Sequence, residues 1–167
     1  MLNTLEKIGV RAKAAAQELK VATKAAKDKA LLLAASEVRS NSKAIIKANV
    51  SDLNFAHDKK LTAALLDRLM LDEARLESIA SGLEMIAQLP DPVGTVLSTW
   101  DRPNGLNISR VSVPLGVIGI IYESRPNVTA DAGGLCLKSG NAVILRGGSE
   151  SFHTSGELVR CLKRGLR

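Results

Sequence analysis

An apolar run of ten residues, VPLGVIGIIY at positions 113–122, constrains the fold more than any other feature of the sequence. The run is about half the length that a helix needs to cross a bilayer, so we expect no membrane span. It is rich in β-branched residues and apolar on both faces, which is typical of a strand in a parallel sheet with helices over it. The run therefore predicts an α/β fold.

The composition changes sharply at Pro90. All five prolines lie between Pro90 and Pro126, and eleven of the thirteen glycines follow Pro90. Ten alanines among the first forty residues predict that residues 1–89 form a helical segment. Three- and four-residue spacing predicts one stripe of the first helix that faces a core. Its members are Leu5, Ile8, Ala12, Ala15, Leu19 and Ala22.

Polar residues mark the starts of later helices in this segment. Ser51, Thr62 and Asp72 are the expected N-caps, because their side chains can accept a hydrogen bond from the first turn. The charged residues of these helices are expected to form a solvated face, with no dedicated binding helix among them.

Residues 90–112 predict a β-hairpin. The prolines of PDP at positions 90–92 end the last helix, and short extended runs then flank RPNG at positions 102–105. Asn-Gly between extended runs is a strong hairpin signal, and Pro103 lengthens the turn beyond two residues.

Residues 113–167 alternate between strand and helix. A helix is expected over residues 128–138, with Lys138 in its last turn and Gly140 in a left-handed cap. A second buried strand follows at residues 141–145, and a second helix starts at Ser149. This order is the opening of a doubly wound fold, and two strands do not complete such a sheet. We therefore expect a truncated fold, the first part of something longer.

The turn RGGSE at positions 146–150 is the first candidate site. It follows a strand and opens a helix, which is a geometry that receives phosphate or ribose oxygens. Arg146 can grip a phosphate, Gly147 and Gly148 allow close approach, Ser149 can cap the helix, and Glu150 can accept from hydroxyl groups. An ordinary strand-to-helix loop with a serine cap fits the spacing equally well.

The second candidate site is YESRPN at positions 122–127, at the carboxyl end of the first strand, where open α/β sheets bind ligands. Pro126 suits a first helical turn, the Asn127 amide could donate to an oxyanion, and Arg125 could bind a carboxylate or phosphate. Spacing alone favours structural roles, with Asn127 and Thr129 as local caps and Arg125 as a surface ion-pair partner.

Other reactive groups point to no further site. Cys136 and Cys161 have neither metal-ligand spacing nor an evident base, so we expect packed thiols and no metal site or disulfide. His57 and His153 are expected at the surface. The N-terminus lacks the features of a secretory signal, which predicts a cytoplasmic protein.

The formal net charge of +6 does not by itself indicate nucleic acid as a partner. The excess is three positive charges on each side of Pro90, so no basic arm stands out. One Trp, one Tyr and two Phe leave little for bases to stack on.

Several longer motifs of the sequence are similar to those of a known protein family. The sequence closely resembles the γ-glutamyl phosphate reductase (glutamate-5-semialdehyde dehydrogenase) family of the aldehyde dehydrogenase superfamily over essentially the whole chain. The motifs that carry it are DPVG (91–94), Trp100, RPNGL (102–106), VPLGVIG (113–119), YESRPNVT (122–129), KSGNA (138–142) and LRGGSE (145–150).

The resemblance implies NADPH-dependent reduction of L-glutamyl 5-phosphate to L-glutamate 5-semialdehyde plus phosphate, in proline biosynthesis. It implies a Rossmann-like NADP-binding domain that begins with residues 113–167, an oligomerisation-type hairpin at residues 90–112, and a homo-oligomer. The family's catalytic cysteine lies in a later domain, and neither Cys136 nor Cys161 matches it. We therefore expect this chain alone to be inactive.

The resemblance also implies roles for single residues. Arg125 and Asn127 would bind substrate, with Asn127 in the oxyanion-stabilising role. The residues expected to bind NADPH are Tyr122, Glu123, Ser124, Arg146, Gly147, Gly148, Ser149 and Glu150. Two alternatives stay open: a noncatalytic remnant that binds nucleotide or pairs with an intact homologous subunit, and a basic helical module that binds nucleic acid.

Overall fold

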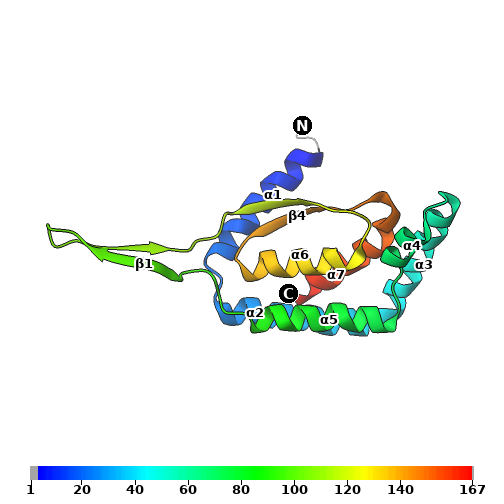
Figure 1. The fold of residues 1–167 in the computed structure, drawn as a ribbon, viewed down its shortest axis with the longest axis horizontal. Coiled ribbons are helices and arrows are strands. Elements are labelled where there is room, and N and C mark those ends of the chain that lie inside the picture. The colour runs from blue at the N-terminus through cyan, green and yellow to red at the C-terminus, as the bar shows by residue number, and fades with distance from the viewer. Residues whose placement is uncertain (1–3, 167) are drawn as a thin grey trace.

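The structure is a computed structural model that describes residues 4–166, and it shows a helical body with a small sheet and a protruding hairpin (Figure 1). The helices, one of them a 3-10 turn, are α1 (Thr4–Lys20), α2 (Lys24–Ser40), α3 (Ser42–Asp58), α4 (Ala63–Leu69), α5 (Glu73–Gln88), α6 (Pro126–Lys138), η1 (Ser149–Ser151) and α7 (Phe152–Gly165). The strands are β1 (Val96–Asp101), β2 (Asn107–Val111), β3 (Val117–Ile121) and β4 (Ala142–Arg146).

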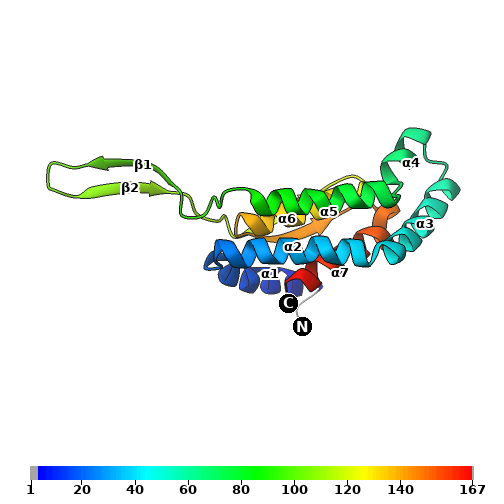
Figure 2. The ribbon, with the colours of Figure 1, turned by 90° about the horizontal axis from the view of Figure 1, so that it is seen from below.

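The core lies where α2 meets α5, α6 and α7. Leu31, Leu83 and Leu158 are fully buried in it. At Gly165, the end of α7 comes so close to α2 that an added Cβ would lie 2.6 Å from both Ala30 O and Ala34 N. The predicted helical segment is therefore a packed layer of helices, and α7 from the far end of the chain lies against it (Figure 2).

The stripe predicted for α1 is only partly in contact with a core. Leu5 is 78% exposed and Ala15 is also exposed, whereas Ala16 is the buried residue of this helix. The helix contacts β4 and β3 near its C-terminal half, where Ala12 and Leu19 are half-buried. The prediction that Leu5, Ile8 and Ala15 face a core is wrong, because in the described part of the chain these side chains are exposed and the buried side of α1 lies at Ala16.

Two of the three predicted N-caps lie at helix starts. Asp72 precedes α5 and accepts a hydrogen bond from the Arg75 amide at 2.7 Å. Thr62 precedes α4, although its side chain makes no capping bond. The prediction for Ser51 is wrong, because Ser51 lies inside α3 and its hydroxyl donates to the Lys47 carbonyl at 3.4 Å.

The predicted hairpin is present. Strands β1 and β2 pair in antiparallel fashion, with Trp100 opposite Ile108. The turn places Gly105 at a φ of +84°, a value that glycine adopts without strain. Every residue of β1 is exposed, and the hairpin extends away from the helical body (Figure 1).

The second sheet is parallel, as predicted, with β3 beside β4 and Gly119 opposite Ile144. Its burial differs from the prediction. Ile121 is 86% exposed and Val117 is 39% exposed, so β3 is not covered on both faces by residues 4–166. Within residues 4–166, α6 and α1 pack mainly against β4, and each strand of this two-stranded sheet has one unpaired edge.

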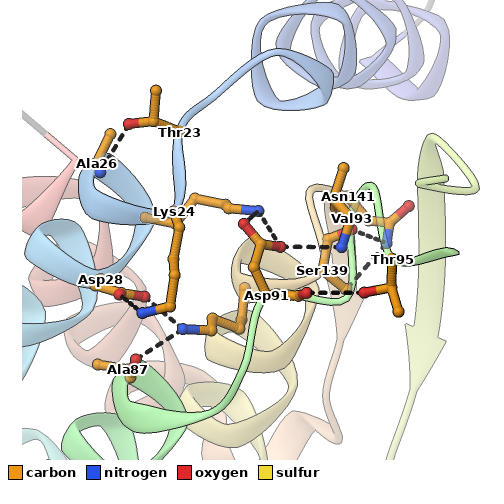
Figure 3. Close-up of polar contacts among 12 residues, drawn as sticks. Thr23, Lys24, Ala26, Asp28, Ala87, Asp91, Val93, Thr95, Ser139 and Asn141 are labelled. Carbon is orange, nitrogen blue, oxygen red and sulfur yellow. Dashed lines mark hydrogen bonds and ion pairs between the residues drawn. The ribbon is translucent and has the colours of Figure 1, made fainter. Parts of the chain in front are cut away.

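The cap of α6 confirms one prediction and adds a contact that the sequence did not reveal. Gly140 has a φ of +73°, the expected left-handed conformation. Lys138 is buried, and its ammonium group donates to the Ala87 carbonyl at 2.7 Å and to Asp28. Asp28 and Ala87 lie together in Figure 3, so this lysine links α6 to α2 and α5.

None of the helices in residues 4–166 combines the length and the apolar character that a bilayer crossing requires.

Candidate functional site

The two predicted site loops lie side by side at the carboxyl end of the parallel sheet. Strands β3 and β4 end at Ile121 and Arg146, which are opposite each other in the register. The Tyr122 amide donates to the Arg146 carbonyl at 3.1 Å, which continues the pairing by one residue. The structure therefore brings residues 122–127 and 146–150 to one edge, as the strand order predicts.

A hydrogen bond between side chains joins the loops. The Ser124 hydroxyl donates to Glu150 Oε2 at 2.6 Å, and Ser149 Oγ donates to Glu150 Oε1 at 3.0 Å. The hydrogen bond from Ser124 is the main reason that the pKa of the Glu150 carboxyl lies below its usual value. Glu150 is therefore ionised at neutral pH and presents a carboxylate that accepts hydrogen bonds.

The two glycines of the turn allow this close approach. A Cβ at Gly148 would lie 2.0 Å from Ser124 Oγ, and one at Gly147 would lie 3.1 Å from the Tyr122 ring. The Tyr122 hydroxyl lies 2.7 Å from Thr129 Oγ1 in α6, which holds the ring in place. Larger residues at the glycine positions would force the two loops apart.

Arg146 leads the turn and is exposed. Its guanidinium group donates to the Gly147 carbonyl, next to it in the chain. Among residues 4–166 it has no acidic partner, so most of its five N–H donors face solvent.

The helix start after the turn differs from the prediction. Ser149 is not a helix cap, because residues 149–151 form the η1 turn and α7 begins at Phe152. The Asp52 carboxylate from α3 accepts hydrogen bonds from the His153 amide at 3.1 Å and the Thr154 amide at 2.8 Å. These amides are therefore satisfied by the protein's own carboxylate and are not open to a bound anion.

Asp52 is a structural residue that the sequence reasoning missed. Asp52 is 2% exposed and also accepts a hydrogen bond from the Thr154 hydroxyl at 2.6 Å. The same hydroxyl accepts a hydrogen bond from the Asn49 amide at 3.2 Å. An acidic residue in the middle of an amphipathic helix carries no signal of a contact made about a hundred positions later. The burial of the Asp52 carboxylate, and the hydrogen bonds that such burial requires, could be recognised only in the folded structure.

Around Arg125 the structure forms a charged rim. Arg125 Nε and Arg68 Nη1 lie 3.7 Å and 3.5 Å from the same oxygen of Glu123. Arg68 comes from α4 and was not predicted to be near either loop. These residues border a pocket of about 320 Å³ that also reaches Ser124 and Glu150. Arg125 is thus a surface ion-pair partner, as spacing favoured, and it is also within reach of a ligand in the pocket.

Asn127 lies in the first turn of α6 and is exposed. Pro126 is the first residue of that helix, as predicted. The Asn127 amide donates to Asp131 Oδ2 at 3.3 Å, one turn further along. The predicted roles of Asn127 and Thr129 as local caps are both wrong: Arg125 precedes α6 as its N-cap and Asn127 donates to a side chain, whereas the Thr129 hydroxyl pairs with Tyr122 and donates to Ser155 at 3.2 Å.

The thiols are packed residues, as expected. Cys136 is 5% exposed and Cys161 is 2% exposed. Burial raises the pKa of both thiols, that of Cys161 to about 11, so neither is a thiolate at neutral pH. His57 and His153 are exposed. In the described part of the chain, no group of three His, Cys, Asp or Glu residues could hold a metal ion.

Relatives of known name match nearly the whole chain. It is 61% identical over 160 residues to the γ-glutamyl phosphate reductase of Rhodospirillum rubrum and 60% identical over 159 residues to that of Paramagnetospirillum magneticum. These alignments cover 96% and 95% of this chain and 38% of each relative. The chain thus spans about 38% of the length of the curated relatives it matches. A scan against models of protein families finds no match.

Solved structures agree with the sequence matches. The γ-glutamyl phosphate reductase of Thermotoga maritima superposes with a TM-score of 0.95 at 38% identity, over 98% of this chain and 40% of that one. The Saccharomyces cerevisiae reductase gives a TM-score of 0.93 at 34% identity, over 99% of this chain and 42% of that one. A propionaldehyde dehydrogenase from Clostridium phytofermentans is 15% identical, with a TM-score of 0.66 over 99% of this chain and 34% of that one, and shares the fold alone.

The resemblance found in the motifs is therefore confirmed, and in sequence and fold this mixed α/β chain matches the N-terminal portion of γ-glutamyl phosphate reductases.

Proposed function

We propose that this chain provides the coenzyme turn and part of the substrate site for the NADPH-dependent reduction of L-glutamyl 5-phosphate to L-glutamate 5-semialdehyde and phosphate. The observation that carries the proposal is the Ser124–Glu150 hydrogen bond of 2.6 Å, which joins the two loops at the carboxyl end of the sheet. The names of the relatives support the reaction, a step of proline biosynthesis.

The donor set at the turn fits a phosphorylated ribose. Glu150 is ionised and can accept hydrogen bonds from ribose hydroxyls, since each carboxylate oxygen accepts more than the one bond it has here. Arg146, the first residue of the same turn, offers N–H donors that suit a 2′-phosphate and therefore NADPH over NADH. When bound, NADPH would supply the hydride. Tyr122, Glu123, Ser124, Gly147, Gly148 and Ser149 complete the proposed cradle.

On the substrate side we assign Arg125 and Asn127. Arg125 lies at the rim of the pocket, and its contact with Glu123 is 3.7 Å long, so its donors are available to an anionic group of the substrate. Asn127 carries an amide at the start of α6, where the positive end of the helix adds to its ability to stabilise an oxyanion. The nucleophile would come from another part of the enzyme, because Cys136 and Cys161 are both buried.

A noncatalytic role remains the second candidate, and the two buried thiols favour it for the chain by itself. In that role the chain would bind nucleotide or pair with an intact homologous subunit. We also propose a cytoplasmic location and a homo-oligomer, both by analogy with the family.

A chimera tests the proposal. This chain would replace the N-terminal portion that it matches in the Rhodospirillum rubrum reductase, which is 61% identical. We expect the chimera to reduce NADP⁺ with glutamate 5-semialdehyde in a phosphate-dependent reaction, at a rate within about tenfold of the parent, while this chain alone gives no turnover. A folded chimera without activity, or turnover by the chain alone, would contradict the proposal.

A further inference from the structure

A second pocket shares Arg68 and Arg125 with the first and lies between the end of α4, the start of α5 and the first turns of α6. Its volume is about 380 Å³, which is ample for an amino acid. The polar residues that matter to the argument are Arg68, Arg75, Arg125, Asn127 and Asp131. The apolar lining residues are Met70, Leu71 and Ile79.

Asp131 gives this pocket a negative group without a counterion. It is half-buried in α6, and among residues 4–166 it has no ion-pair partner. Its hydrogen bond is the one from the Asn127 amide at 3.3 Å. Loss of water around the carboxyl raises its pKa, so a cation that entered the pocket would relieve an unfavourable burial of charge.

Arg68 and Arg125 give the pocket its positive groups. Their side chains are 47% and 44% exposed, and both contact one oxygen of Glu123 at distances longer than a hydrogen bond. Most of their N–H donors are therefore free. Arg75 differs, because it is held by Asp67 Oδ1 at 2.7 Å and by the Met70 carbonyl at 3.0 Å. Arg75 thus shapes the wall, whereas Arg68 and Arg125 can bind a carboxylate.

We propose that this pocket recognises the amino-acid end of the substrate, with Asp131 binding the α-ammonium group and Arg68 with Arg125 binding the α-carboxylate. The assignment rests on the proposed function for the identity of the substrate. It adds two specificity-determining residues, Asp131 and Arg68, to a pocket that also contains Asn127, the proposed oxyanion donor. Opposite charges in the lining of one pocket select a zwitterion over a simple anion or a simple amine.

Binding of small probes to the full chain tests the proposal without any turnover. L-Glutamate, glutarate and 4-aminobutyrate would be titrated into the labelled chain, and backbone amide shifts near Arg68 and Asp131 followed by NMR. Glutarate lacks the ammonium group, and 4-aminobutyrate lacks the α-carboxylate. We expect L-glutamate to bind with a Kd about tenfold or more below those of the two analogues.

Variants assign each end of the ligand. Asp131→Asn keeps the shape and removes the charge, so the Kd for L-glutamate should rise about tenfold while that for glutarate does not rise. Arg68→Gln should raise the Kd for L-glutamate and leave the Kd for 4-aminobutyrate unchanged. Asp58→Asn removes an exposed carboxylate that lies outside the pocket lining, and it is the matched control, with no effect expected.

Three results would overturn the inference: no shifts with L-glutamate, equal affinity for glutarate and L-glutamate, or an unchanged Kd in a folded Asp131→Asn variant. If Asp131→Asn fails to fold, the Arg68→Gln series decides. The chimera is a separate test of the reaction, so an active chimera together with any of these results would reject only the pocket assignment. An inactive chimera together with selective L-glutamate binding would reject only the reaction.

Discussion

Lys27 Nζ lies 2.8 Å from both carboxylate oxygens of Asp91. Lys27 belongs to α2 and Asp91 lies between α5 and the hairpin, so this ion pair joins that connecting segment to α2. The lysine is 2% exposed, and the Asp91 side chain is 17% exposed. Asp91 also accepts from the Val93 amide at 3.0 Å, as the dashed lines around Asp91 in Figure 3 show. A largely buried ion pair therefore joins the segment before the hairpin to α2.

Removing the ammonium group should be costly. Lys27→Met keeps most of the apolar stem and leaves Asp91 without its cation, so we expect the free energy of unfolding to fall by about 2–4 kcal/mol. Urea unfolding followed by circular dichroism measures this. The double variant Lys27→Met/Asp91→Asn should lose clearly less than the sum of the two single changes, since no orphan charge remains. Simple additivity would show that the pair is not coupled.

The chain should lose stability in acid through Asp28 and Asp91. Burial alone would raise the pKa of both carboxyls, but hydrogen bonds from Lys138 and Lys24 to Asp28, and from Lys27 and the Val93 amide to Asp91, bring both below the usual value of 3.8. The folded state then favours the ionised form, so the stabilisation is complete above about pH 5 and is lost as the pH falls below 4. Unfolding curves between pH 7 and pH 2.5 test this. In the Lys27→Met/Asp91→Asn variant the decline should be shallower, and an identical decline would contradict the assignment to Asp91.

Two glycines of α7 should respond in opposite ways to alanine. A Cβ at Gly165 would meet backbone atoms of α2 at 2.6 Å, which cannot move aside as a side chain can, so Gly165→Ala should destabilise the chain by about 1–3 kcal/mol. Gly156 has nothing within 4 Å of the position of a Cβ, so Gly156→Ala should stabilise the helix by about 0.5–1 kcal/mol. Thermal unfolding of both variants gives the comparison. Equal effects would mean that α7 is not in close contact with α2.

Asp52 should behave as the cap of α7 and not as a surface charge. Asp52→Asn weakens three hydrogen bonds to His153 and Thr154 in a buried place, and we expect a loss of about 1–3 kcal/mol. Asp58→Asn, an exposed change in the same helix, should stay within about 0.5 kcal/mol of the parent. Native-state hydrogen exchange of the first α7 amides should quicken only in the Asp52 variant. If both variants exchange alike, Asp52 is not the cap.

Local signals were enough to predict Pro126 in a first helical turn, the Gly140 cap, the hairpin turn and the parallel pair of strands, although α6 begins two residues before the expected span of 128–138. Each depends on residues close together in the sequence. Burial was harder to predict. The apolar residues Val117 and Ile121 match a strand covered on both faces, yet they are exposed within the described chain, because apolar character indicates a preference for burial and not the presence of a covering element.

Contacts between distant positions could not be predicted from spacing. The contacts of Lys138 with Asp28 and of Asp52 with Thr154 join residues about a hundred positions apart, and the neighbours of Lys138 and Asp52 along the chain indicate neither partner. The two candidate site loops were predictable, since each follows a strand of one parallel pair. Their link through Ser124 and Glu150, and the approach of Arg68 from α4, required the fold.

The most direct test of the claim that residues 146–150 hold the coenzyme is to measure the KM values for NADP⁺ and NAD⁺ in the chimera. Arg146→Gln removes the cation at the start of the turn without filling the turn. We expect the KM for NADP⁺ to rise about tenfold or more while kcat and the KM for NAD⁺ change less than twofold, because only the 2′-phosphate loses a partner. Equal KM values for NADP⁺ before and after the change, in a folded and active chimera, would contradict the account.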